Sequence, residues 1–258
     1  MSLTWEADSL VNLRSNNVDR YTRNFLRQAV CEFRFPTLME IGEQRPPADF
    51  VSALRKEYPH LELGNEVTLG IGGGSNGFNN SHILRSAKLT WTVSLKQSAV
   101  SLETTAYTNY AQLRERVLRV VAAASKVIDS DFFTRVGLRY INVIDTDEDP
   151  ANGWVNPELV APILSGHFEG IKEYGGKLQL MAEDGGCLLQ HGIRFQEQHG
   201  GSMPKYMLDI DSFRNEVPID SAADALDAMH SQAFDMFDWA IGAKAREQLS
   251  AVKASTKG

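Results

Sequence analysis

The chain has 258 residues, of which 43% are hydrophobic, so it can form one large domain or two small ones around a hydrophobic core. The formal net charge of -7 gives no electrostatic argument for nucleic-acid binding, and no apolar run approaches the roughly 20 residues that a membrane-spanning helix needs. Cys31 and Cys187 lie in apolar runs and are expected to be buried, reduced thiols; without a signal-peptide pattern, the default prediction is a cytoplasmic protein.

The first quarter of the chain predicts an extension, a strand and a helix. Residues 1–20 are expected to form a polar, solvated extension. Strand 28–35 and helix 48–58 follow, and a proline ends each of them. The glycine-rich run 70–77 lacks the Gly-Lys-Ser/Thr ending of a phosphate-binding loop, so a flexible loop is predicted there.

The middle of the chain predicts a hairpin and a long helix. Strands are expected at 84–95 and 98–107. Period-two alternation gives the first of them an apolar face made of Leu89, Trp91, Val93 and Leu95. Helix 109–128 follows, because apolar residues recur at three- and four-residue steps after Asn109, which can cap the helix.

The second half of the chain predicts a similar series. It comprises strand 132–144, helix 157–164, strands 177–183, 187–196 and 205–213, helix 221–248 and a frayed tail at 250–258. The two series nearly repeat, with matching runs at Phe33-Arg34-Phe35 and Leu138-Arg139-Tyr140, and at Ser101–Thr104 and Met207–Ile210.

These elements predict an α+β fold, a largely antiparallel sheet with two long helices on one face. The order of elements also indicates a degenerate internal duplication of a β-α-β-β-α unit. The globular domain would span residues 21–249, with pseudo-halves at about 21–130 and 131–249.

Signatures of metal or cofactor chemistry are missing from the sequence. Cys187 and His191 are too far apart along a strand to share a zinc ion, and the acidic link after Asp145 lacks the spacing of a calcium loop. No Gly-x-Ser-x-Gly elbow is present. We therefore expect no metal and no cofactor.

A polar sheet face carries the candidate ligand-binding residues, which are Arg34, Arg139, Arg194, Glu103 and Asn142. Planar guanidinium groups in register could hold an anionic ligand. The structural alternative is a solvated or salt-bridged sheet face, in which the arginines pair with strand carboxylates such as Asp209 and Asp211.

Several blocks resemble a sporadically distributed family of uncharacterised bacterial and archaeal proteins. The blocks are Asn24–Arg27 leading to Cys31–Pro36, Leu54–Pro59, Trp91–Leu95, Ser101–Thr104 and Phe133–Asn142. The resemblance spans roughly residues 21 to 245, and it implies one family fold without an established activity, cofactor or catalytic residue.

Two functions follow as hypotheses. The first is a non-enzymatic binding or interaction protein whose polar sheet face or helix surface receives a protein partner or an anionic small ligand. The alternative is an enzyme acting on a phosphorylated or carboxylated small molecule, with Glu103 or His191 as acid/base. Neither nucleic acid nor a membrane is an expected partner, whereas exposed sheet edges would allow a homo-oligomer.

Overall fold

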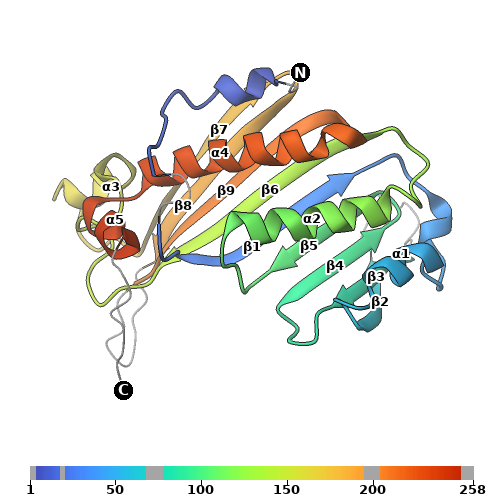
Figure 1. The fold of residues 1–258 in the computed structure, drawn as a ribbon. Coiled ribbons are helices and arrows are strands. Elements are labelled where there is room, and N and C mark those ends of the chain that lie inside the picture. The colour runs from blue at the N-terminus through green and yellow to red at the C-terminus, as the bar shows by residue number, and fades with distance from the viewer. Residues whose placement is uncertain (1–3, 18–20, 68–77, 195–203, 251–258) are drawn as a thin grey trace, which may run out of the picture. The chain divides into compact units, whose positions relative to one another are not determined.

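The computed structural model describes residues 4–17, 21–67, 78–194 and 204–250. The glycine-rich run 70–77 and all but the first residue of the expected frayed tail, 250–258, lie outside these ranges. The strands form one antiparallel sheet of nine strands in the order β2-β3-β4-β5-β1-β6-β9-β8-β7. The predicted α+β class with a largely antiparallel sheet is therefore confirmed (Figure 1).

The chain divides into two compact units, described in turn below. Unit 1 comprises residues 28–138 and 213–227, and unit 2 comprises residues 4–27, 139–212 and 228 onward. Three strands and one helix contribute residues to both units: β1 (Leu26–Arg34), β6 (Phe132–Ile144), β9 (Tyr206–Pro218) and α4 (Ala222–Ala240).

Unit 1 is a meander of strands closed by its first strand. Its elements are β1 (Leu26–Arg34), η2 (Met39–Gly42), α1 (Ala48–Leu54), β2 (His60–Val67), β3 (Phe78–Arg85), β4 (Trp91–Lys96), β5 (Ala99–Thr104), α2 (Tyr110–Ala124) and η3 (Ile219–Ser221). β2 to β5 pair antiparallel in sequence order, and β5 pairs with β1. As expected, the Asn109 side chain caps α2 by accepting a hydrogen bond from the Gln112 backbone N–H at 2.9 Å.

The core of unit 1 lies between α2 and the face of the sheet that the helix covers. α2 packs against β5 and α1 (Figure 1). Its buried stripe is Leu113, Val117, Val120, Val121 and Ala124, and the sheet contributes Cys31, Phe33, Val93, Val100 and Leu102. This arrangement buries Trp91, Val93 and Leu95, three of the four residues that the alternation predicted for one apolar face.

Two expectations for unit 1 need correction. The expected strand 84–95 is two strands, because the chain turns between Arg85 and Trp91. Leu89 lies in that turn with a φ of 57° and is 59% exposed, so it does not share the buried face of β4. The sequence analysis also missed β2, although Leu61 and Leu63 alternate with polar residues there.

Unit 2 contains the second meander and most of α4. Its remaining elements are η1 (Glu6–Ser9), α3 (Pro157–Leu164), β7 (Glu173–Ala182), β8 (Gly185–Arg194) and α5 (Ala243–Ser250). β7 and β8 form a hairpin that turns after Ala182, and α3 begins at Pro157 with Asn156 as its cap. The bounds predicted for β6 and α3 are confirmed.

The expected helix 221–248 is wrong, because the chain leaves the helix after Ala240 and starts α5 at Ala243. Ile241 forms a β-bridge with Val155, and the Gly242 N–H donates to the Trp154 carbonyl at 2.8 Å. A Cβ on Gly242 would lie only 2.2 Å from the Gly153 carbonyl oxygen. The glycine is therefore required by a close backbone approach.

The N-terminal segment 4–17 packs onto unit 2 instead of extending into solvent. Trp5, Ala7 and Val11 are buried. The Asp184 carboxylate, in the turn between β7 and β8, accepts hydrogen bonds from the backbone N–H groups of Glu6 and Ala7. Carboxylates on α4 hold later residues of the segment in the same way.

The order of elements repeats along the chain. In each series a strand and a helix precede a meander whose last strand lies beside the first strand, and a long helix follows. The first series has one strand more than the second, namely β2. This arrangement agrees with the predicted duplication, which remains a prediction.

Both cysteines are free and buried, which confirms that expectation. Among the helices of the described residues, none combines the length and the apolar character that crossing a membrane requires.

Candidate functional site

The predicted site residues of unit 1 lie on the sheet face that α2 does not cover. Arg34, at the end of β1, forms an ion pair with Glu32 at 2.7 Å and its side chain is 55% exposed. Glu103 accepts a hydrogen bond from Gln28 at 3.1 Å. Arg34 and Glu103 share a face but do not meet, because Glu103 pairs with Val30, in the middle of β1, whereas Arg34 pairs with Ala99.

In unit 2, Arg139 is held by a carboxylate. Its guanidinium donates two hydrogen bonds to Asp209, Nε to Oδ1 at 2.8 Å and an Nη to Oδ2 at 2.5 Å. These bonds raise the pKa of Arg139 above its ordinary value. Arg34 and Arg139 are thus both paired with carboxylates, as the structural alternative expects, and are less suited to receive an anionic ligand.

The other predicted residues of unit 2 do not join Arg139. Asn142 is only 4% exposed, and because it follows Arg139 by three positions along β6, it lies on the opposite face, with Tyr140 and Ile144. Arg194 ends β8 opposite Glu173, and its side chain lies outside the described part of the structure.

His191, a candidate acid/base, is packed into a structural contact. Its ring lies parallel to that of Tyr206, and Nδ1 is 2.6 Å from the Tyr206 hydroxyl oxygen. A Cβ on Gly176 would meet the His191 Nε2 at 2.7 Å, so the imidazole rests on the bare backbone of β7. Burial lowers the pKa of His191.

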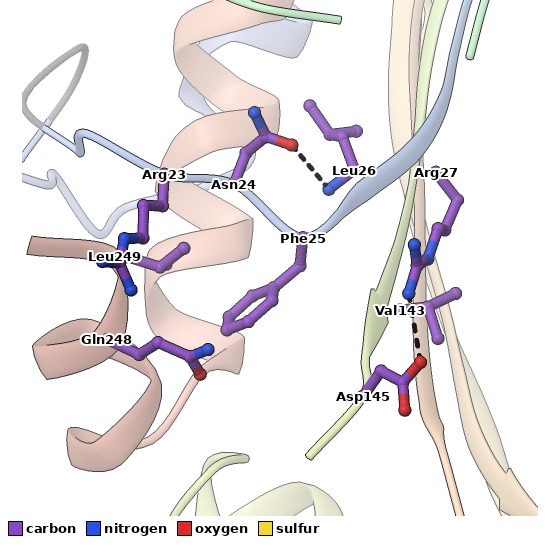
Figure 2. A pocket seen from close by; sticks show the side chains of 9 residues that line it. All are labelled: Arg23, Asn24, Phe25, Leu26, Arg27, Val143, Asp145, Gln248 and Leu249. Carbon is purple, nitrogen blue, oxygen red and sulfur yellow. Dashed lines mark hydrogen bonds and ion pairs between the residues drawn. The ribbon is translucent and has the colours of Figure 1, made fainter. Parts of the chain in front are cut away.

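A pocket of about 140 Å³ offers a different site, which lies entirely in unit 2 (Figure 2). Its walls come from the start of β1, the end of β6 and the last turn of α5. The lining residues are Arg23, Asn24, Phe25, Leu26, Arg27, Val143, Asp145, Gln248 and Leu249. Segments far apart in the sequence therefore build the pocket together.

Backbone hydrogen bonds fix the walls of this pocket. The Leu249 carbonyl accepts from the N–H groups of Thr22 at 3.0 Å and Arg23 at 3.2 Å, which ties the chain before β1 to the end of α5. The Val143 N–H donates to the Phe25 carbonyl at 2.9 Å, and this bond ties the same chain segment to β6. The pocket is therefore held from two sides before any ligand enters.

The charges around the pocket favour an anion. Asp145 forms ion pairs with both Arg27, at 3.2 Å, and Lys205, at 2.7 Å. Arg23 lines the pocket, and its guanidinium has no hydrogen-bond or ion-pair partner among the described residues. Positive charge is thus in excess around the pocket of a chain whose net charge is -7.

The pocket also contains a buried amide oxygen without a partner. Gln248 Oε1 is buried, and neither atom of the amide has a hydrogen-bond partner in the described part of the chain. Burying an amide without a partner costs about 1–3 kcal/mol, so a partner supplied by a ligand would recover that free energy.

The sequence contains little that points to this site. Arg23 and Arg27 stand out only as part of a locally basic stretch, and Gln248 lies at the end of a helix that reads as continuous. The pocket depends on the break at Gly242, which directs α5, and on pairing between distant segments.

The described residues contain no group of three or more His, Cys, Asp or Glu side chains placed to hold a metal ion. Comparison with known proteins finds no matching family model and no matching curated protein.

Proposed function

We propose that the protein is a non-enzymatic binding protein that takes a small anionic molecule into the pocket between β1, β6 and α5. One observation carries the proposal: the buried Oε1 of Gln248 has no hydrogen-bond partner among the described residues, and it lies in a pocket that the exposed side chain of Arg23 also lines. A concave site with apolar walls and a few convergent polar groups is typical of ligand-binding pockets.

The composition of the pocket favours binding over catalysis. The lining residues include one carboxylate, that of Asp145, and it is ion-paired with Arg27 and Lys205. A general base needs a free lone pair close to the proton that it removes, and a nucleophile needs such a base beside it. Neither arrangement is present among the lining residues, and this supports binding over catalysis.

The family resemblance and the thiols agree with this proposal. The block Asn24–Arg27, which begins the resemblance to the uncharacterised family, lines the pocket, and the block Phe133–Asn142 ends one residue before Val143. We also propose a cytoplasmic location, which the free thiols of Cys31 and Cys187 support.

Anion titration followed by amide NMR tests the proposal. Acetate, inorganic phosphate and a set of small carboxylates would be added to labelled protein, and the amide signals of Phe25 and Val143 followed. We expect at least one anion to shift both signals with saturation. Arg23→Gln should weaken that binding about tenfold or more, because it removes the charge-assisted contact.

Arg45→Gln is the matched control, since Arg45 is an exposed arginine in unit 1. It should leave the binding unchanged. Signals at Phe25 and Val143 that no anion shifts, or shifts that persist equally in Arg23→Gln, would overturn the proposal.

A further inference from the structure

We infer that the ligand is a small carboxylate that also carries a neutral amide, an inference that rests on the proposed function. The pocket presents two different polar groups, the exposed guanidinium of Arg23 and the buried Gln248 Oε1, which has no partner among the described residues. Its apolar lining residues include Phe25, Val143 and Leu249. A ligand that satisfies all three features needs an anionic end, a hydrogen-bonding end and a carbon body between them.

The volume limits the size of the ligand. A dry cavity of about 150 Å³ accommodates a molecule the size of benzene. The pocket has about 140 Å³ and opens to solvent, so a ligand with roughly six to nine non-hydrogen atoms fits.

The walls distinguish a carboxylate from a bare inorganic anion. A guanidinium binds carboxylate and phosphate equally well through its planar fork. Inorganic phosphate, however, has no carbon body to cover Phe25, Val143 and Leu249, whose side chains line the pocket beside Arg23. Each methylene of a carboxylate that is buried against these side chains strengthens binding by removing apolar surface from water, which phosphate cannot do.

The second end of the ligand is neutral, because the surrounding charge is positive. Asp145 is already ion-paired with Arg27 and Lys205. No other carboxylate among the lining residues could pair with an ammonium group on a ligand. The Gln248 amide both donates and accepts hydrogen bonds. A primary amide on the ligand can donate to the Gln248 Oε1 and accept from its Nε2 through two parallel hydrogen bonds, whereas a methyl group can do neither.

Three molecules of equal size test this inference: succinamate, succinamide and 4-methylpentanoate, each with about eight non-hydrogen atoms. Succinamate has both ends, succinamide lacks the charge, and 4-methylpentanoate lacks the amide. Dissociation constants would come from NMR titration of the full chain. We expect succinamate to bind about tenfold more tightly than either analogue.

Two variants assign each preference to its residue. Gln248→Leu should abolish the preference for succinamate over 4-methylpentanoate and keep the preference over succinamide. Arg23→Gln should abolish the preference for succinamate over succinamide and keep the preference over 4-methylpentanoate. Amide signals that spread as in the wild type show that each variant is folded.

The outcomes separate this inference from the proposed function. Equal affinities for all three molecules, or stronger binding of phosphate than of succinamate, overturn the ligand class while leaving anion binding in place. Failure of every anion to shift the signals of Phe25 and Val143 overturns both. A preference for succinamate that survives Gln248→Leu overturns the role of the amide.

Discussion

Arg139 and Asp209 lie on neighbouring strands, β6 and β9, and are joined by two hydrogen bonds, although Asp209 is only 5% exposed. Burial removes most of the hydration of the Asp209 carboxylate. Hydrogen bonds from the partly exposed Arg139 guanidinium take the place of the lost water. Such a pair contributes little net stability, but it becomes costly when one partner is lost.

Replacement of Arg139 should therefore destabilise the protein more than replacement of Arg34. Arg139→Ala leaves the Asp209 carboxylate buried and unpaired, and we expect a loss of about 2 kcal/mol in the free energy of unfolding. Arg34→Ala breaks an exposed pair and should cost less than about 0.5 kcal/mol. Urea denaturation of both variants measures the difference, and equal losses would contradict the structural role of Asp209.

Gly242→Ala should be among the more damaging single-methyl substitutions. The new Cβ would press on the Gly153 carbonyl oxygen, which belongs to the backbone and cannot rotate away. We expect a loss of about 3 kcal/mol, measured by thermal or urea unfolding. Gly166→Ala is the comparison: its φ is +67° but the space around it is open, so it should cost only about 1 kcal/mol.

The attachment of the N-terminal segment can be tested by proteolysis. Asp235, which is 2% exposed, accepts hydrogen bonds from the Arg14 side chain at 2.9 Å and the Ser15 N–H at 2.7 Å. Asp235→Ala removes both bonds and should make trypsin cleave after Arg14 several times faster, because cleavage requires local opening. Mass spectrometry follows the product. In the control variant Asp129→Ala, at an exposed position, trypsin should cleave after Arg14 at the wild-type rate.

His191 should make stability depend on pH. Burial lowers the pKa of His191 below 6.5, so the unfolded chain takes up a proton at a higher pH than the folded protein does. The stability is therefore complete above the unfolded pKa of about 6.5 and falls as the pH is lowered through that value towards the folded pKa.

His191→Gln should remove this part of the pH dependence, which unfolding curves between about pH 5 and pH 7.5 would show. His167→Gln, at an exposed position, should retain it. Identical pH profiles for wild type and His191→Gln would contradict the assignment.

Periodicity in the sequence was sufficient to find the elements with strong patterns. β6 and α3 have the predicted bounds, and α2 begins after the predicted cap at Asn109, because local sequence determines these features. Leu89 was misplaced because a residue in a turn with positive φ can carry an apolar side chain that fits the neighbouring alternation.

Non-local contacts explain most of what the sequence could not predict. The helix break depends on the approach of Gly242 to Gly153, about 90 residues away, which no helical periodicity encodes. Matching runs placed Glu103 and Asp209 at corresponding points of the two series, yet Glu103 bonds Gln28 while Asp209 bonds Arg139. The pocket was missed for the same reason, since its polar groups are unremarkable until three distant segments meet.

The Leu249 carbonyl accepts hydrogen bonds from the backbone N–H groups of both Thr22 and Arg23. These two amides can therefore report whether the pocket is open or closed. Their rate of exchange with deuterated solvent depends on how often α5 and the start of β1 separate. A bound ligand that bridges Arg23 and Gln248 would hold the two walls together and slow that exchange. Occupancy could thus be read from the exchange of two backbone amides, without attaching a label to the protein.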